Sequence, residues 1–358
     1  MKKTFLLFFL VLSNCIIYAQ MPIARFDSLY SELSQMLSSH KPINFKKAVF
    51  ANENMFFDNE LKENDFEKNV SFLVSLVKAK CKNISTLNTK EKDFETLKLH
   101  SALFNIFADT TKIIDDKDTL LFLPFRYDFD DMFGERDLTK MFVTKLLNTH
   151  TGNCHSMPLL YKIICDELKM PCHLALAPHH IYIKLYSEKI GWYNTELTSA
   201  SFPTDSWIMA SGYVSLEAIQ SGLYMDTLSE REMLTLCVYD LAKIYSVKFP
   251  NSDGAFIIKC CDLAIKYNPK CLSALAFKAE TERKQWDKLM KTNNKTIEEL
   301  REQSNSKILW DDIANLYSQI YKLGYRPMPK NVYSDWMTSL KKESEKYTNK
   351  KVLTTDKY

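Results

Sequence analysis

Three residues in the middle of the chain have the chemistry of an activated nucleophile. Cys154 stands at the start of a segment with helical spacing of apolar residues, where the helix dipole and free backbone N–H groups favour a thiolate. An oxyanion formed beside it could use the same N–H groups. His180 and Glu196 follow in two segments of alternating apolar and polar residues. A histidine that takes the thiol proton and an acid that orients its ring would activate Cys154 toward acyl groups.

The segment after Cys154 is expected to be a helix that ends before Pro171. Its apolar residues fall on one helical face: Met157, Leu160, Tyr161, Ile164, Cys165 and Leu168. We therefore expect Leu160 and Ile164 to face the interior of the protein, with Cys154 in the first turn of the helix.

Two probable strand segments after this helix predict an antiparallel hairpin whose turn is Ser187-Glu188-Lys189. Pairing Tyr186 with Ile190 places His180 directly opposite Glu196 and on the same face, with Cβ atoms about 5 Å apart. A slip of one residue would undo this placement.

The same pattern separates neighbouring candidates. His179 points to the opposite face of the strand from His180, so His180 is the expected base. Asn194 lies on the same face as Glu196 and is the alternative orienting group.

Around these residues the sequence resembles the transglutaminase-like family, which shares its core with papain-type cysteine proteases. The resemblance covers about residues 120–210. It is carried by Gly152-Asn153-Cys154-His155-Ser156-Met157-Pro158-Leu159-Leu160-Tyr161, by Ala177-Pro178-His179-His180-Ile181-Tyr182-Ile183 and by Trp192-Tyr193-Asn194-Thr195-Glu196.

The resemblance implies an α+β fold and assigns roles within it. Cys154 would be the nucleophile, His180 the base and Glu196 the orienting acid. Apart from the resemblance, Asn153 and Asn194 are expected to support the site. Many members have Asp as the acid, so Glu196 is a departure with a longer side chain. The sequence is most similar to an exported bacterial subgroup in which tetratricopeptide repeats follow the catalytic domain.

The first residues predict export. Lys2 and Lys3 precede a short apolar run, and a small residue, Ala19, precedes Gln20, which is typical of a cleaved signal peptide. Location in the periplasm or outside the cell follows from this prediction. Acylation of Cys15, as in a lipoprotein, is the alternative. No later segment has the run of about 20 apolar residues that a membrane span needs.

The remaining chain divides by its pattern into successive segments. We expect a signal peptide over 1–19, a helical segment over 20–118, a transglutaminase-like domain over 119–210, a helical repeat-like region over 211–347 and a flexible tail over 348–358. The helix that ends at Asn268-Pro269 and the small residues from Cys271 onward are typical of a tetratricopeptide joint. The expected architecture is thus a transglutaminase-like or papain-like core between two helical regions.

Composition limits the class of function. Only 7 glycines in 358 residues argue against a phosphate-binding loop enzyme, and a net charge of +3 does not suggest a nucleic-acid surface. The eight cysteines after the signal peptide mostly lie in apolar helical patterns, so we expect buried free thiols, with Cys154 as the exception.

A zinc site is a second chemical interpretation. Five of the seven histidines lie close together in the sequence, with two cysteines among them, but CxxC and HExxH spacings are absent. The five are His150, His155, His173, His179 and His180. We therefore predict neither a metal ion nor another cofactor.

The sequence leads to two hypotheses of different classes. The first is an exported cysteine peptidase, amidase or acyltransferase that forms a thioester at Cys154 on a protein or peptide substrate. The alternative is a catalytically silent scaffold whose helical repeats bind a protein partner on a concave surface. Thiol reactivity separates the two.

Overall fold

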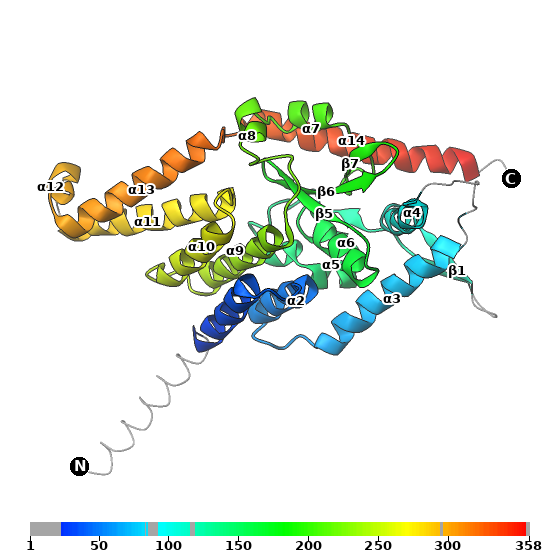
Figure 1. Cartoon of the computed structure of the whole chain (residues 1–358), viewed down its shortest axis with the longest axis horizontal. Helices are drawn as coiled ribbons and strands as arrows, with labels where there is room; N and C mark the ends of the chain where they lie inside the picture. Colours follow the sequence, from blue (N-terminus) through cyan, green and yellow to red (C-terminus); the bar gives the residue numbers. More distant parts are fainter. Residues whose placement is uncertain (1–22, 83, 85–91, 115–118, 294–295, 356–358) are drawn as a thin grey trace, which may run out of the picture. The chain divides into compact units, whose positions relative to one another are not determined.

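The computed structural model describes residues 23–82, 84, 92–114, 119–293 and 296–355, and it has a mixed α+β fold (Figure 1). Helices make up most of it, and small antiparallel sheets lie between N-terminal and C-terminal helical regions of the sequence. This confirms the predicted α+β class. The predicted signal peptide, 1–19, and Cys15 lie outside the described residues.

The chain forms two compact units, and each unit combines separated stretches of sequence. The first consists of residues 1–61 and 230–320, and the second of residues 62–229 and 321–358. The contiguous segments expected from the sequence pattern do not coincide with these units. Residues before 62 belong with the later helices, because their apolar faces pack on one another rather than on the segment that follows them in sequence.

The first unit is helical. It contains a helix over residues 23–38, α2 (Phe45–Phe56), α9 (Glu230–Lys248), α10 (Ala255–Tyr267), α11 (Leu272–Asn293), α12 (Ile297–Arg301) and most of α13 (Ser304–Lys322). Phe26 ties the first helix to the later ones: its ring lies 5.2 Å from that of Tyr245 and 5.8 Å from that of Phe256. Such edge-to-face aromatic contacts add to the free energy gained by burying the rings.

The predicted joint between two helices in this unit is confirmed. Helix α10 ends at Tyr267, Asn268 and Pro269 follow, and α11 begins at Leu272. The Asn268 side chain accepts a hydrogen bond from the backbone N–H of Lys270, which fixes the turn. Helices α9, α10 and α11 pack against each other in sequence order.

The second unit holds all the strands. Its elements are α3 (Glu63–Lys82), α4 (Phe94–Ala108), β1 (Thr111–Ile114), β2 (Thr119–Phe122), β3 (Arg126–Tyr127), a 3-10 helix η1 (Leu138–Met141), α5 (Val143–Thr149), β4 (Thr151–Gly152), α6 (Ser156–Glu167), β5 (His173–Ala177), β6 (His180–Ser187), β7 (Gly191–Thr195), α7 (Asp205–Ser211), α8 (Leu216–Gln220) and α14 (Lys330–Thr355). Strands β5, β6 and β7 form an antiparallel sheet in that order, while β3 pairs with β4 in parallel.

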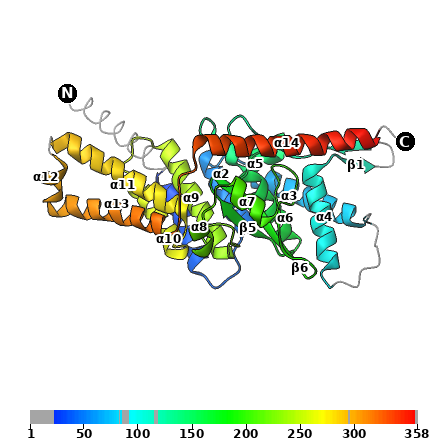
Figure 2. The ribbon, with the colours of Figure 1, turned by 90° about the horizontal axis from the view of Figure 1, so that it is seen from above.

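Helix α14 extends through part of the segment expected to be a flexible tail. It continues to Thr355, so residues 348–355 are helical, and only 356–358 lie outside the described part. Figures 1 and 2 show α14 as the long red helix along one side of the second unit. The polar sequence after Tyr347 is compatible with an exposed helix as well as with a loose tail.

Helix α6 is the central helix of the second unit. Every residue from Ser156 to Cys165 is buried, including Leu160 and Ile164, which have no exposed surface. The prediction that Leu160 and Ile164 face the interior is confirmed, but burial is not limited to one face. Even Lys162 is buried along its stem, and it pairs with Asp166 one turn later.

Truncation of this core should destabilise the protein strongly. Replacing Leu160 with alanine should lower the free energy of unfolding by about 2–5 kcal/mol, because the lost methyl groups leave a cavity in a packed interior. Ile190→Ala is the matched control, since that side chain is 67% exposed. Chemical denaturation of the two variants measures both values, and equal unfolding free energies would refute the placement of Leu160.

Candidate active site

Cys154 lies in the turn immediately before α6. The helix begins at Ser156, so Cys154 is two residues outside the helix rather than within its first turn. Strand β4 ends at Gly152 and pairs with β3, which brings Tyr127 next to the residues that precede the cysteine. The sulfur is therefore fixed between a helix start and a short parallel strand pair.

Asn153 holds this turn together. Its side-chain oxygen accepts hydrogen bonds from the backbone N–H groups of His155 and Ser156, and its amide donates to the carbonyl of Met132. It thus fixes the turn that leads into α6 and is fully buried. These two N–H groups are already bonded to Asn153, so they are not free for an oxyanion as the sequence suggested. Asn153 supports the position of Cys154 instead.

The hairpin has a different register from the predicted one. Ser187 pairs with Gly191 and Lys184 with Asn194, so the turn is Glu188-Lys189-Ile190 and the pairing is shifted by two residues. The regular ladder ends at Ile183–Thr195, and His180 is not directly opposite Glu196. Because side chains alternate along a strand, a shift of two preserves the face on which each residue lies. His180 and Glu196 therefore lie on the same face, as expected, although the predicted register was wrong.

His180 and Glu196 meet through a short hydrogen bond. The imidazole Nε2 lies 2.6 Å from the Glu196 Oε2 atom, and both side chains are almost fully buried. The other carboxylate oxygen of Glu196 accepts from the backbone N–H of Thr198 at 2.8 Å. Glu196 is held in place by this bond and by its backbone bridge to Ser201. The longer glutamate side chain spans the diagonal offset that the register leaves between the two residues.

Cys154 completes the cluster on the other side of the imidazole. Cys154 and His180 interact directly, and Glu196 already bonds Nε2, so Nδ1 is the ring nitrogen left for the sulfur. Nδ1 is buried and has no hydrogen-bond partner among the described residues. The sulfur also lies 3.6 Å from the backbone carbonyl oxygen of His179. The three predicted catalytic residues are thus brought together.

The electrostatics favour charge separation in this cluster. Burial alone would raise the pKa of Cys154, but the adjacent His180 outweighs it and lowers that pKa. Burial opposes the charge of His180, whereas the Glu196 carboxylate and Cys154 raise its pKa to about 10. Burial also opposes the charge of Glu196, yet His180 and the Thr198 N–H lower its pKa. The three groups therefore stabilise one another's charged forms, which are a thiolate, an imidazolium and a carboxylate.

Asn194 does not orient the histidine. Its amide nitrogen donates to the carbonyl of Pro203 and, at 2.7 Å, to the carboxylate of Asp205. This ties β7 to the start of α7. Of the two groups considered for orienting His180, the structure brings Glu196 to the ring and places Asn194 in a supporting contact.

Three aromatic residues of the site were not predicted. The hydroxyl of Tyr127 is buried beside Cys154, and burial together with the charge of Cys154 raises the pKa of that tyrosine. From α14, the Trp336 ring lies 5.1 Å from that of His180, and Tyr333 contacts His179. Alternating aromatics and acids around residue 127 were the only sequence signal for Tyr127. The pattern gave no signal for α14, which is about 180 residues from Cys154 in sequence.

The candidate metal ligands are dispersed into separate contacts. The His150 ring stacks on Phe125, and its Nδ1 bonds the carbonyl of Leu123, while His155 bonds the carbonyl of Met141. The ring of His173 lies against Trp192. In the described ranges no group of three or more His, Cys, Asp or Glu side chains is arranged to hold a metal ion.

The eight cysteines of the described residues are unpaired. Cys81, Cys154, Cys165, Cys172, Cys237, Cys260, Cys261 and Cys271 are all free thiols and all buried. This confirms the expectation of buried free thiols. Burial raises the pKa of several of them, among them Cys165, Cys237 and Cys260, which contrasts with the lowered pKa of Cys154.

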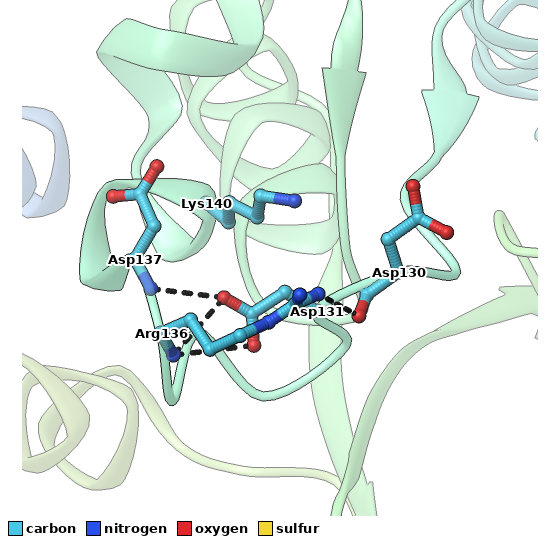
Figure 3. Close-up of a pocket in the computed structure, with 5 residues that line it drawn as sticks. All are labelled: Asp130, Asp131, Arg136, Asp137 and Lys140. Carbon is cyan, nitrogen blue, oxygen red and sulfur yellow. Dashed lines mark hydrogen bonds between the residues drawn. The ribbon is translucent and has the colours of Figure 1, made fainter.

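A solvent-open pocket lies in the loop before α5, and charged residues line it: Asp130, Asp131, Arg136, Asp137 and Lys140 (Figure 3). Asp131 accepts hydrogen bonds from the backbone N–H groups of Glu135, Arg136 and Asp137, so its carboxylate organises the loop itself. Asp128 pairs with Lys140 at 2.8 Å. Asp131 and Asp128 therefore both have partners within this segment.

Comparison with known proteins gives no match. No family model, no curated protein and no solved structure is similar to this chain. Among the helices of the described residues, none combines the length and apolar character that crossing a membrane requires.

Proposed function

We propose that this chain is a cysteine-dependent enzyme of acyl chemistry, with Cys154 as nucleophile, His180 as base and Glu196 as orienting acid. The observation that carries the proposal is the 2.6 Å bond between Glu196 and His180 Nε2, which leaves Nδ1 for the thiol of Cys154. The depressed pKa of Cys154 is the property that such a nucleophile needs.

The proposed reaction proceeds through a thioester. The Cys154 thiolate attacks the carbonyl carbon of an amide, and a carbon–sulfur bond forms as the carbonyl oxygen takes the negative charge. The imidazolium of His180 then gives its proton to the leaving nitrogen, and the carbon–nitrogen bond breaks. Water attacking the thioester gives hydrolysis, whereas an amine gives acyl transfer. In both cases His180 removes a proton from the attacking molecule, and the carbon–sulfur bond breaks to release the Cys154 thiolate. Glu196 stabilises the imidazolium in between.

We further propose that the second unit is a transglutaminase-like or papain-like core. The order of its parts supports this: a cysteine at the start of a buried helix, a histidine on the next long strand and an acid at the end of the hairpin. In the same proposal, residues 1–19 direct export to the periplasm or the outside, and the packed helices α9, α10 and α11 form a repeat-like region that binds a protein or peptide.

A catalytically silent scaffold is the second candidate, and one observation favours it. Cys154 is only 6% exposed, so little of its surface is available to a substrate carbonyl in this conformation. In that case α9, α10 and α11 would carry the function by binding a partner protein.

Acyl trapping separates the two candidates. The protein is mixed with p-nitrophenyl acetate, a generic acyl donor, and the release of nitrophenolate and the mass of each cysteine peptide are followed. The proposal predicts that the acetyl group appears on the Cys154 peptide before any other. Cys154→Ser abolishes this acetylation, and Cys172→Ser is the matched control. Acetylation that is equal on several cysteines, or absent, would favour the scaffold.

A further inference from the structure

Helix α14 covers the candidate active site. The Trp336 ring packs edge-on against His180, with ring centres 5.1 Å apart, and Tyr333 lies 5.0 Å from Phe133 and 6.0 Å from His179. The hydroxyl of Tyr333 and the indole N–H of Trp336 are both buried without a hydrogen-bond partner among the described residues. The aromatic pair therefore occupies space beside the Cys154–His180 cluster without forming the polar contacts that a permanent wall would be expected to satisfy.

Few of the described side chains of α14 are buried against the second unit. Trp336, Met337 and Leu340 are the buried apolar residues of the described part of α14, and they form one narrow stripe along it. By contrast, ten successive residues of α6 are buried. Segments with few buried apolar contacts open at a lower free-energy cost than the packed core. Helix α14 can therefore leave the site while the fold beneath it stays intact.

The segment that leads into α14 is bonded to α8 and its flanking residues up to residue 326, and three further residues precede the helix. Ser221 donates to the carbonyl of Leu323, Ser215 donates to that of Gly324, and Arg326 pairs with Glu217. These bonds hold the chain to α8 up to residue 326. Pro327-Met328-Pro329 then leads into α14. Prolines lack a backbone N–H and resist helix continuation, so this segment separates α14 from the anchored turn.

We propose that α14 is an autoinhibitory cover that places Tyr333 and Trp336 where the acyl substrate must enter. This inference rests on the proposed function, because a cover matters only if Cys154 reacts. In the closed form the thiolate is activated but inaccessible, and lifting α14 exposes it. The observed reaction rate is the intrinsic rate multiplied by the fraction of molecules that are open.

The test changes α14 at an exposed position of the full-length protein. Thr338→Pro should break the helix between Trp336 and Leu340, whereas Thr338→Ala should preserve it and is the matched control. Thr338 is exposed, and its hydroxyl bonds only the Ser334 carbonyl one turn earlier. Trp336→Ala is a second variant that removes the ring over His180, with the exposed Tyr321→Ala as its control.

The readout is iodoacetamide labelling of each cysteine peptide as a function of pH. The proposal predicts that Thr338→Pro and Trp336→Ala raise the plateau rate of Cys154 labelling by about ten- to one-hundredfold. The pH midpoint of that labelling should still rise when His180→Ala is added to either variant, and labelling of the core residue Cys165 should stay slow. The pH midpoint of Cys154 labelling and its dependence on His180 test the proposed function, whereas the plateau rate tests the cover. The two proposals can therefore fail independently.

Two results would overturn the cover. An unchanged or reduced plateau rate in both variants would mean that α14 does not restrict access, or that it supports the active geometry. Faster labelling of both Cys154 and Cys165 would mean that α14 is part of the folding core and not a separable cover.

Discussion

Replacing His180 with alanine should slow the acetylation of Cys154 by p-nitrophenyl acetate by about 10²–10⁴-fold, the usual contribution of a general acid or base. His180 contributes most to lowering the pKa of Cys154 against the effect of burial, with a smaller contribution from Tyr127, so that pKa should rise when the imidazole is removed. A larger fraction of the sulfur would then be protonated thiol, which is a weak nucleophile. Nitrophenolate release under single-turnover conditions measures the loss.

His179→Ala is the matched control for this prediction. The two histidines are adjacent, but the ring of His179 contacts Phe133 and Tyr333, and only its backbone carbonyl approaches Cys154. The variant should keep the pH midpoint of Cys154 labelling. If both replacements reduce acetylation equally, His180 has no specific role and the choice between the two residues is wrong.

Glu196→Gln should weaken both the activation of Cys154 and the fold. An amide keeps a hydrogen bond to the ring but removes the charge, so the pKa of His180 should fall by about 1–3 units. The free energy of unfolding should fall by about 1 kcal/mol, because a hydrogen bond to a charged group is replaced by a weaker one to a neutral group. Glu188→Gln, on the exposed turn of the same hairpin, is the control.

The stability effect of Glu196→Gln should depend on pH in a defined window. The pKa of Glu196 is below 4.5 in the fold, so its contribution is present above pH 4.5 and is lost as the pH falls through the folded value. The pKa of His180 is raised from 6.5 to about 10, so its contribution is complete below pH 6.5 and is lost as the pH rises through about 10. The variant should therefore differ most from the wild type between pH 4.5 and 6.5. Urea unfolding at several pH values measures this, and a constant difference would contradict the ion pair.

Local pattern predicted the parts of the site that depend on one helix and one hairpin. The apolar period after Cys154 identified α6, and strand alternation chose His180 over His179 and paired it with Glu196. The register was wrong by two residues because the sequence does not show which three residues form the turn. The error did not change the face of the sheet on which His180 and Glu196 lie, because side chains alternate with a period of two. A register error of one residue would have placed them on opposite faces.

The features that the sequence did not predict depend on contacts between distant segments. Residues before 62 join the unit that contains α9, α10 and α11, and the last helix joins the unit that contains Cys154. A helical stripe such as Trp336, Met337 and Leu340 shows that a helix has an apolar face but not which surface it covers. For the same reason, the sequence did not show that Cys154 is buried or that aromatic side chains of α14 lie beside the site.

The pH dependence of Cys154 alkylation tests the central claim most directly. Iodoacetamide labelling of the wild-type protein is followed peptide by peptide, and the rate for each cysteine is fitted to its own titration. We predict that Cys154 titrates below the ordinary thiol pKa of 9.0, that Cys165 and Cys237 titrate above it, and that His180→Ala moves the Cys154 midpoint upward. A Cys154 midpoint that coincides with those of the other buried thiols and does not move in His180→Ala would contradict a thiolate activated by His180.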